Sequence, residues 1–389
     1  MYTIEARNVQ EAYVRGLGLV RERGFQQETR NGPALVVPGP VMTVYGQPME
    51  RVLLDPTRDA NPFFHLLESF WMLAGRNDVA SLEPFNGGLK NYSDDGFRYH
   101  GAYGHRWRNH FDDDQLQKLI TLLREQPTTR QAVLTMWDPE QDLAQVGKDF
   151  PCNTQIYFRM RGREVAISDL TPEMVEELQA RRLESDPDLL ALDMTVCCRS
   201  NDAIWGAYGA NAVHFSVLLE FVAAAVGVHV GRMYQLSNNL HAYLPALEKV
   251  GDACWPVTNV SGHREYNYVR SVPMAETITS ETTTYPFATK STPLFDRCRE
   301  VSVPVIMADV DDIWRFVQEL WSAEPAQPVR MPETHIMSEV GIRTIANMVS
   351  AYHNFKQRDR SGALYFADMI PGPDWSRACT EWLERRYAA

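Results

Sequence analysis

The sequence has too little positive charge for several classes of protein. Its 389 residues include 38 Lys and Arg against 50 Asp and Glu, which gives a formal net charge of −12. Binding to nucleic acid or to a membrane surface through counterion release needs a basic face, so this balance argues against both. A small anionic substrate needs only a local cluster of arginines and is therefore not excluded.

Cysteine and long apolar runs are also scarce. Six cysteines are too few for a disulfide scaffold in a chain of this length, and none stands in a C-x-x-C pair. The N-terminus has no basic segment followed by an apolar core, so we expect no signal peptide. The longest apolar stretch, around Phe221–Val230, is too short to span a bilayer. We therefore expect a protein of the reducing cytoplasm, without a membrane segment.

Hydrophobic patterning predicts an α/β core. Residues 61–74 have helical apolar spacing behind an Asn that can cap the helix. Three runs rich in β-branched and aromatic residues predict strands: Ala132–Trp137, Thr154–Met160 and Met194–Arg199. Residues 213–227 are apolar almost all round, which predicts a central buried helix.

The rest of the chain predicts an insertion and a C-terminal extension. A charged helical segment after Thr171 suggests an insertion over a hairpin, at about residues 169–192. Residues 250–300 are irregular in pattern, and three amphipathic helices follow, at Asp309–Ala323, Val340–Gln357 and Asp374–Tyr387. We therefore expect an α/β core over residues 1–300 and a helical extension over 301–389.

Cys152, in DFPCNTQIYF, is the first candidate for chemistry. Pro151 fixes the backbone before it and a β-rich run follows, so the thiol stands at a strand start where it could face a cleft. A thiolate attacks carbon well, but it needs a positive neighbour to form near neutral pH. A buried inert cysteine is the commoner fate of this residue type, and the local sequence leaves both interpretations open.

Polar residues elsewhere form a second group of candidates. Arg30 lies in a turn-like TRNG, Arg130 precedes a strand, and Arg199 with Ser200 ends another. Forked guanidinium donors and a hydroxyl suit a phosphate, and a surface ion pair is the alternative for each arginine.

Glu68 stands mid-helix in HLLESFWML, as a surface carboxylate or as an acid in a cleft. Asn211 enters the apolar helix, as a cap or a ligand group. His241 and Tyr243 alternate in NNLHAYL and could both face a ligand, or be ordinary half-buried aromatics.

Taken in order, seven segments resemble the thymidylate synthase family, which includes phage and biosynthetic pyrimidine-nucleotide hydroxymethylases. The segments are ESFWMLAG, YGHRWR, TTRQAVLTMW, PCNTQIYF, CCRSND, GAYGANAVHF and LSNNLHAYL, and they run from about Arg30 to Val250. The resemblance implies the family's α/β (α+β) fold, a mixed sheet packed by helices, and makes residues 1–300 a catalytic domain. It also favours a reactive rather than an inert Cys152.

The resemblance also implies roles for single residues. Cys152 matches the nucleophile that adds to carbon 6 of a pyrimidine nucleotide, after which carbon 5 captures the one-carbon unit of 5,10-methylenetetrahydrofolate. Glu68 matches the acid/base carboxylate that works through ordered water, and Tyr103 a tyrosine of the proton-transfer network. Asp202 resembles the aspartate that contacts the folate pterin. No metal is implied.

Nucleotide contacts follow in the same way. Arg30, Arg199 and Ser200 match ligands of the 5′-phosphate, and the cationic phosphate pocket is expected to help depress the pKa of the cysteine. Arg130 matches an arginine lent across a dimer interface, which implies a homodimer with shared sites. His241 and Tyr243 match the pair of residues that holds the sugar 3′-hydroxyl.

Asn211 matches the residue that reads the base. An amide donates and accepts at once, which suits uracil O4 and the adjacent N–H, whereas relatives acting on cytosine tend to carry an aspartate. The match needs one extra residue in GAYGAN; if that residue belongs elsewhere, Ala210 faces the base instead.

Several positions depart from the synthase pattern. Gln131 replaces an arginine, and Asn153 replaces the usual His after the nucleophile. Leu89 and Tyr92 align with tryptophans, one of which shields the reactive methylene in synthases. A smaller residue at Leu89 would let water capture the methylene before hydride does. No short C-terminal closing segment is found, although synthases rely on that closure to exclude water.

These departures favour hydroxymethylation of dUMP at carbon 5, a reaction that would fit a modified base in phage DNA or a nucleoside natural product. A divergent thymidylate synthase and a dCMP or CMP hydroxymethylase remain alternatives of the same class. A non-catalytic nucleotide-binding protein, with the C-terminal helices as an interaction module, is the alternative of another class. A Cys-His hydrolase is a more distant one, because it needs a His beside Cys152.

Overall fold

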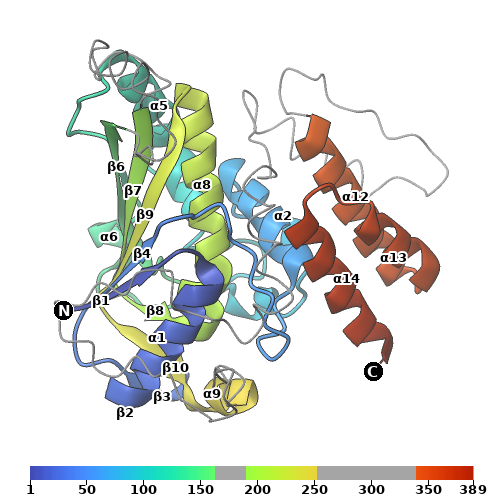
Figure 1. Cartoon of the computed structure of the whole chain (residues 1–389). Coiled ribbons are helices and arrows are strands. Elements are labelled where there is room, and N and C mark those ends of the chain that lie inside the picture. Colours follow the sequence, from blue (N-terminus) through green and yellow to red (C-terminus); the bar gives the residue numbers. More distant parts are fainter. Residues whose placement is uncertain (163–189, 252–338, 389) are drawn as a thin grey trace, which may run out of the picture.

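Two β-sheets organise the core of the chain, and helices pack against them (Figure 1). The computed structural model describes residues 1–162, 190–251 and 339–388. The insertion predicted after Thr171, the helix predicted at Asp309–Ala323 and the boundary predicted at residue 300 all lie outside the described residues, apart from the last residues of the insertion range, 190–192, which begin a strand.

The larger sheet has six strands in the order β1-β4-β9-β7-β6-β5. Their bounds are Tyr2–Ala6, Val41–Tyr45, His229–Ser237, Leu190–Cys198, Asn153–Gly162 and Val133–Thr135, in that spatial order. The pairs β1/β4 and β9/β7 are parallel and the other three are antiparallel. The sheet is therefore mixed, as predicted, and three of its strands coincide with the predicted β-rich runs.

The smaller sheet has four strands in the order β2-β3-β10-β8. Their bounds are Phe25–Thr29, Gly32–Val36, Leu240–Tyr243 and Asn201–Asp202. Only the pair β10/β8 is parallel. This sheet brings the turn that carries Arg30 together with two segments that are about 170 residues or more further along the chain.

Helices surround both sheets. In the core they are α1 (Val9–Arg23), α2 (Pro62–Leu73), α3 (Val79–Leu82), η1 (Leu89–Tyr92), α4 (Tyr103–Arg108), α5 (Gln115–Glu125), α6 (Pro139–Asp142), η4 (Ala203–Ala210), α8 (Asn211–Val226) and α9 (Leu244–Val250). Helix α2 begins as predicted, because the side-chain oxygen of Asn61 accepts the backbone N–H of Phe64 at 3.1 Å.

The central buried helix is α8, which continues from the π-helical segment η4. Together they run over Ala203–Val226, which is long and apolar enough to cross a membrane by length and composition. The apolar stretch is therefore longer than the one around Phe221–Val230. Because 83% of its most apolar window is buried inside the protein, it is the core helix around which the sheets are packed.

Three helices follow at the C-terminal end: α12 (Glu339–Lys356), α13 (Arg360–Asp368) and α14 (Pro373–Ala388). The first and third confirm the predicted helices in this region. The short α13 was not predicted; it begins at Asp359, whose side chain accepts the backbone N–H of Gly362 at 3.0 Å. The predicted class, an α/β fold with helices at its C-terminal end, is confirmed.

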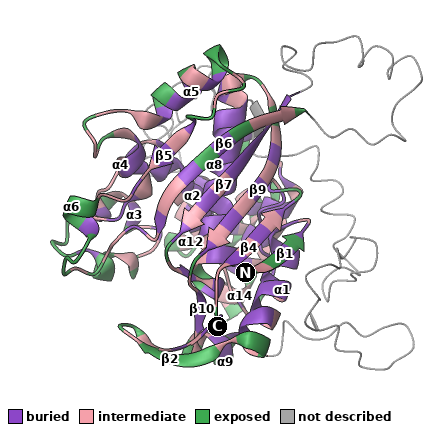
Figure 2. Ribbon diagram, turned by 90° about the vertical axis from the view of Figure 1, so that its left-hand side faces the viewer, coloured by how far each residue is buried: buried purple, intermediate pink, exposed green. Residues whose placement is uncertain are grey.

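One face of the six-stranded sheet is less covered than the other (Figure 2). Strands β4 and β9 alternate between buried and half-buried residues, and the buried side packs toward α8. On the other side a cross-strand row of five partly exposed residues joins five strands: Val133, Tyr157, Thr195, Tyr234 and Val44. This row is apolar and aromatic for the most part, which is unusual for a face turned to water.

Candidate active site

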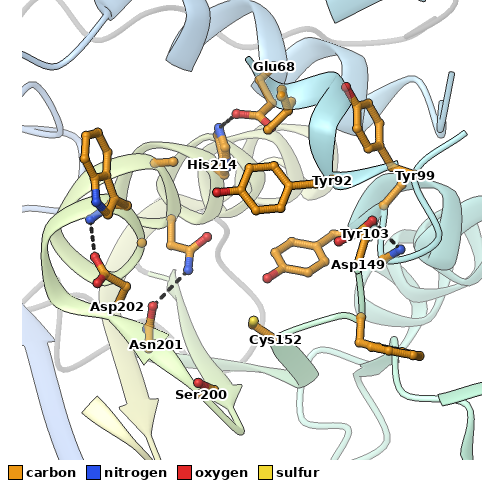
Figure 3. Close-up of a pocket in the computed structure, with 18 of the residues that line it drawn as sticks. Glu68, Tyr92, Tyr99, Tyr103, Asp149, Cys152, Ser200, Asn201, Asp202 and His214 are labelled. Carbon is orange, nitrogen blue, oxygen red and sulfur yellow. Dashed lines mark hydrogen bonds and ion pairs between the residues drawn. The ribbon is translucent and has the colours of Figure 1, made fainter. Parts of the chain in front are cut away.

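A pocket of about 1070 Å³ lies where α2, α8, β6 and the smaller sheet meet (Figure 3). Eleven of the twelve residues predicted for the site line it: Arg30, Glu68, Leu89, Tyr103, Cys152, Arg199, Ser200, Asp202, Asn211, His241 and Tyr243. Arg130 does not; it is exposed, three residues ahead of β5. The sequence segments named above thus converge on one cavity of a size that suits small-molecule ligands.

Cys152 stands immediately before β6, as predicted, and its backbone oxygen accepts the N–H of Arg199 at 2.9 Å. Burial raises the pKa of its thiol, Arg199 and Arg30 lower it, and the carboxylate of Asp149 raises it. The two arginines lower the pKa of Cys152, as predicted, but its net shift is upward. Desolvation of the thiolate outweighs the two arginines.

Tyr103 lies beside the nucleophile, at the start of α4. Its hydroxyl accepts the backbone N–H of Asn153 at 3.3 Å, and its ring stacks on Phe215 with centroids 5.9 Å apart. Burial, and after it the neighbouring Cys152, raises the pKa of the Tyr103 hydroxyl well above its ordinary value. The phenol therefore keeps its proton and can donate a hydrogen bond into the pocket.

Arg199 and Arg30 both hold the loop before Cys152. Arg199 donates to the backbone oxygens of Pro151 and Phe150, at 3.0 and 3.3 Å. Arg30 donates to the backbone oxygens of residues 147 and 148, at 2.7 and 3.0 Å. The two guanidinium groups come from different sheets and reach the same loop, which places two cations at the nucleophile's side of the pocket.

Lys148 adds a further cation that the sequence analysis did not identify. It lines the pocket, and its ammonium group donates to the backbone oxygen of Ser93 at 3.2 Å. Gln131 stands where the synthase pattern has an arginine. It is exposed and does not line the pocket. Lys148 precedes Cys152 by only four positions, and this proximity was the available signal.

Asp149 is another lining residue that the sequence analysis missed. One carboxylate oxygen accepts the backbone N–H of Gly101 at 2.8 Å. Burial raises the pKa of Asp149, while the Gly101 N–H and His100 lower it. Its negative charge lies close enough to the thiol of Cys152 to influence it, as described above.

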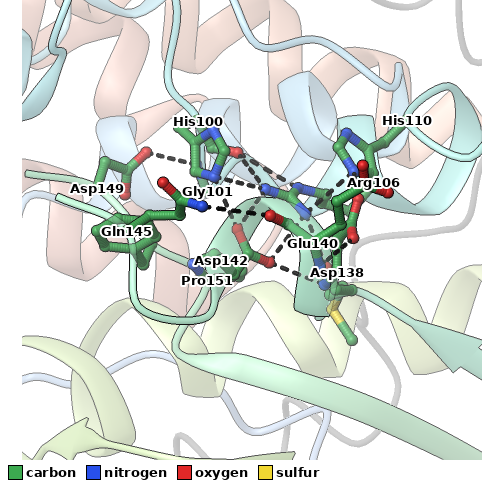
Figure 4. A network of polar contacts seen from close by, with 12 residues as sticks. His100, Gly101, Arg106, His110, Asp138, Glu140, Asp142, Gln145, Asp149 and Pro151 are labelled. Carbon is green, nitrogen blue, oxygen red and sulfur yellow. Dashed lines mark hydrogen bonds and ion pairs between the residues drawn. The ribbon is translucent and has the colours of Figure 1, made fainter. Parts of the chain in front are cut away.

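A buried ion-pair network supports the loop that leads to the nucleophile (Figure 4). The guanidinium of Arg106 makes two contacts with the carboxylate of Asp142, at 2.9 and 3.0 Å, and it is fully buried. The same carboxylate lies 2.7 Å from Nε2 of His100 and accepts the backbone N–H of Asp138 at 2.8 Å. Because the contact is bidentate and dry, it ties α4 firmly to α6 and so to the chain that follows.

Glu68 extends from α2 into the pocket and meets a histidine from α8. Its Oε2 atom lies 3.0 Å from Nε2 of His214, whose side chain is 5% exposed. His65, one turn before Glu68, packs edge-on against His214 with ring centroids 6.3 Å apart. Burial, with Arg58 and His214 nearby, holds the pKa of His65 well below its usual range. His65 is therefore neutral, and His214 is the imidazole that lies close to the carboxylate of Glu68.

Asn211 begins α8 with its side chain in the pocket and 9% exposed. Its amide nitrogen donates to the side-chain oxygen of Asn201 at 3.1 Å, and Asn201 in turn donates to Ser237 at 3.1 Å. This chain of contacts fixes the orientation of the Asn211 amide. Ala210 also lines the pocket, but only Asn211 brings a polar side chain there.

The π-helical segment η4 immediately precedes Asn211. A π turn accommodates one more residue than an α turn over the same helical length. Gly209 departs from helical geometry, with φ −112° and ψ −114°, and a Cβ atom there would lie 2.7 Å from the backbone oxygen of Ile204. The π-helical geometry therefore accommodates one residue more before Asn211 than an α-helix would, and this geometry requires glycine at position 209.

Asp202 caps η4 and faces the pocket. One carboxylate oxygen accepts the backbone N–H groups of Ile204 and Trp205, at 2.8 and 2.5 Å. The other oxygen is buried and has no hydrogen-bond partner among the described residues. Burial raises the pKa of Asp202, and the Trp205 N–H and His241 lower it. An unpaired buried acceptor of this kind is suited to a ligand that donates N–H groups.

His241 and Tyr243 both lie on β10 and point into the pocket, as predicted. Their rings pack edge to face with centroids 5.2 Å apart. Nδ1 of His241 lies 3.0 Å from the side-chain oxygen of Asn239, and the Tyr243 hydroxyl accepts the side-chain N–H of Asn31 at 3.3 Å. Residues two apart on a strand share a face, which explains their convergence.

Leu89 and Tyr92 lie on η1 at the rim of the pocket. Leu89 is half-buried and Tyr92 is 55% exposed. Arg58 and Trp205 lie elsewhere along the wall, with the guanidinium 4.4 Å from the centre of the indole ring. Neither was identified from sequence, because each stands in a loop or an irregular turn without periodicity. His214 could have been identified, since it follows Asn211 by three positions on one helix face.

Comparison with known proteins identifies the family. The protein-family model described as thymidylate synthase matches residues 11–255 of this chain. A deoxyuridylate hydroxymethyltransferase of Pseudomonas phage M6 is 39% identical over 396 residues, covering 100% of this chain and 95% of that protein. One of Bacillus phage SP01 is 33% identical and covers 63% of this chain and 59% of that protein. The crystal structure of thymidylate synthase from T4 phage is 17% identical, with a TM-score of 0.45, and covers 62% of this chain and 79% of that chain. The chain belongs to the thymidylate synthase family.

Proposed function

We propose that this protein is a folate-dependent hydroxymethyltransferase that acts on carbon 5 of dUMP. The observation that carries the proposal is the similarity over the whole chain to a phage deoxyuridylate hydroxymethyltransferase, together with a pocket that holds eleven of the predicted site residues. The nucleotide's monophosphate suits the side of the pocket where Arg30, Lys148 and Arg199 supply positive charge.

Cys152 is the proposed nucleophile toward carbon 6 of the pyrimidine. Formation of a covalent adduct divides a difficult substitution into two easier steps. Arg199 favours the thiolate, whereas burial and Asp149 oppose it, so the nucleophile needs a proton acceptor as the substrate enters. The protonated hydroxyl of Tyr103 lies on the same side of the pocket and can move a proton at carbon 5 through water.

The pair of Glu68 and His214 is the proposed acid/base group. A carboxylate in contact with an imidazole can accept a proton from water and pass it on, which is what the addition of water to an exocyclic methylene needs. Leu89 leaves the rim less shielded than a tryptophan would, and this favours capture by water over capture by hydride.

The residues of the pocket also fit the proposed cosubstrate. Asp202 offers a buried carboxylate oxygen that has no hydrogen-bond partner among the described residues, which suits the N–H groups of a pterin, and Leu89 and Trp205 offer apolar surface in the same pocket. When bound, 5,10-methylenetetrahydrofolate supplies a one-carbon unit at the oxidation level of formaldehyde. The protein's own part is to orient the pterin with Asp202 and to hold the nucleotide opposite it.

A homodimer is part of the proposal. The cross-strand row of Val133, Tyr157, Thr195, Tyr234 and Val44 supports pairing of the six-stranded sheet with that of a second copy. Arg130 is exposed beside the edge strand of that sheet, where it can reach a partner's pocket. Mixed dimers of Arg130→Ala and Cys152→Ala subunits should then regain activity, because one site receives both native residues; no recovery would argue against the shared site.

Mass spectrometry of the reaction product tests the activity. The protein is incubated with methylenetetrahydrofolate and dUMP, dCMP or CMP in parallel, and Cys152→Ala is the control. We expect 5-hydroxymethyl-dUMP and tetrahydrofolate from dUMP alone, and a Cys152→Ala variant that binds dUMP but does not turn over. A methyl product with dihydrofolate would make the protein a thymidylate synthase. No product from any nucleotide would favour a binding protein.

A further inference from the structure

The three C-terminal helices have no part in the proposed chemistry, yet they contact the walls of the pocket. We name α12, α13 and α14 (Glu339–Ala388) the C-terminal bundle. Figure 1 shows α12 and α14 beside α2, the helix that carries Glu68, and contacts between these helices confirm it. Among the contacts that join the bundle to the core in the described residues, two sets end at residues that line the pocket or adjoin it.

The first set is a bidentate ion pair between Arg386 of α14 and Asp59. The two guanidinium nitrogens lie 2.8 and 2.7 Å from the two carboxylate oxygens, and Arg385 adds a contact at 3.2 Å. Although burial acts to raise it, pairing with Arg386 and Arg385 lowers the pKa of Asp59. The guanidinium of Arg386 also lies 4.2 Å from the ring centre of Trp382, so its position is fixed on both sides.

Asp59 needs such support, because its backbone is strained. Its φ angle is +51°, in the left-handed region that non-glycine residues seldom adopt. Residues in such conformations persist when the surrounding structure holds them, and they concentrate at functional sites. Asp59 itself lines the pocket, and so does Arg58 next to it, whose Nε atom donates to the backbone oxygen of Ile204 at 2.7 Å. The ion pair therefore fixes the turn that places Arg58 against Trp205.

The second set centres on Tyr352 of α12. Its hydroxyl donates to the backbone oxygen of Phe85 at 3.0 Å, and its ring stacks on that of Phe85 with centroids 5.4 Å apart. Phe63, in the first turn of α2, packs between Tyr352 and Trp382, at 5.3 and 5.6 Å. Phe85 belongs to the segment between Leu82 and Leu89, which both line the pocket. The bundle thus holds both segments that flank the start of α2.

We propose that the C-terminal bundle is a structural part of the folate side of the pocket, with Arg386 and Tyr352 as its positioning residues. It fixes the turn at Arg58–Asn61, where Arg58 packs against Trp205 next to Asp202, and the segment Leu82–Leu89, whose two ends line the same pocket. The contacts of Arg386 and Tyr352 given above end at Asp59, Trp382, Phe63 and Phe85, none of which lies on β10 or in the loop before Cys152. The bundle therefore governs folate affinity more than nucleotide affinity. This inference rests on the proposed function, because that function identifies this side as the folate side.

A matched pair of variants separates positioning from general stability. Arg386→Gln removes the bidentate ion pair to Asp59 and leaves the single contact from Arg385, whereas Arg377→Gln removes an ion pair of equal length, 2.7 Å, to Glu381 within α14. The two arginine side chains are equally exposed, at 32% and 31%. Tyr352→Phe is the second test variant, since it removes the hydroxyl that bonds to the backbone of Phe85 and also interacts with the side chain of Asn61. All are made in the full chain.

Hydrogen exchange of the unliganded protein is the first measurement. Arg386→Gln should speed amide exchange in residues 55–64, Tyr352→Phe in residues 82–92, and Arg377→Gln in neither. The second measurement is KM for methylenetetrahydrofolate, with calorimetric binding of tetrahydrofolate in the presence of dUMP. We expect KM to rise about tenfold in Arg386→Gln, the effect of losing one well-made charge-assisted contact, with dUMP affinity unchanged.

Equal losses of folate and nucleotide affinity in Arg386→Gln would overturn the inference, and so would the same behaviour in Arg377→Gln. Unchanged exchange in both test variants would overturn it as well. If the unmodified protein makes no hydroxymethyl product, the proposed function fails, while the exchange measurements still show whether the bundle holds these segments.

Discussion

Nε2 of His214 lies 3.0 Å from Oε2 of Glu68, and the two residues come from different helices of the core, α8 and α2. His214 follows Asn211 by three positions, so a single face of α8 presents both the proposed base-reading amide and the partner of the acid/base carboxylate. The packing of α2 on α8 therefore places the proposed base-reading group and the proposed acid/base pair next to each other in the pocket.

This contact gives the first prediction. His214→Gln replaces the imidazole beside Glu68 by an amide, which cannot exchange a proton with the carboxylate. We expect kcat to fall by about 100-fold, the lower range for loss of general acid–base catalysis, with little change in dUMP affinity. Steady-state kinetics across pH and calorimetry with dUMP measure this. His229→Gln, at the exposed start of β9, is the control. Unchanged kcat and an unchanged pH profile would show that His214 only fills space.

A second prediction concerns the charge beside the nucleophile. Asp149 raises the pKa of Cys152, so Asp149→Asn should lower it and increase the thiolate fraction at pH 7. One pKa unit corresponds to a tenfold change in that fraction, and we expect roughly three- to tenfold faster alkylation by iodoacetamide. Mass spectrometry of the Cys152 peptide follows the reaction, with Cys152→Ala as background. Slower alkylation in Asp149→Asn would contradict the assignment.

The base preference gives a third prediction. Asn211 donates to Asn201, and its amide keeps one more donor and an acceptor for the base. Asn211→Asp should shift preference from dUMP toward dCMP, because a carboxyl group accepts from the cytosine amino group. We expect the ratio of kcat/KM values for the two nucleotides to change by about 100-fold or more, since polar mismatches at a buried site are strongly rejected. An unchanged ratio would mean that Asn211 does not read the base.

A fourth prediction concerns stability. Burial raises the pKa of Asp374, at the start of α14, to about 6, and the Trp375 N–H and Arg51 lower it. The carboxylate therefore weakens the folded state above pH 6, whereas below pH 4 the group is neutral in both the folded and the unfolded state. Stability contributed by the neutral form is lost as pH rises from 4 to 6.

Asp374→Asn should thus raise the free energy of unfolding by up to about 3 kcal/mol at pH 8 and change it little at pH 4. Chemical denaturation at the two pH values measures the difference. The same gain at both values would show that the charge of Asp374 is not the cause.

Local patterns in the sequence predict helices and strands of the core and most residues of the site. Asn61 caps α2, the β-rich runs became β5, β6 and β7, and the apolar residues 213–227 became the buried α8, because these patterns depend on neighbours a few positions away. The seven segments that resemble the thymidylate synthase family, taken in order, predict eleven residues that line one pocket.

How those residues act on one another depends on the tertiary structure. The pairing of His214 with Glu68, the net upward shift in the pKa of Cys152 and the support of Asp59 by Arg386 each join segments far apart in the chain. Such effects depend on distance and on desolvation, which arise when helices and sheets pack. Spacing along the chain carries no information about burial. The sequence therefore predicts that arginines lower the pKa of Cys152, but it does not predict that burial raises this pKa by more.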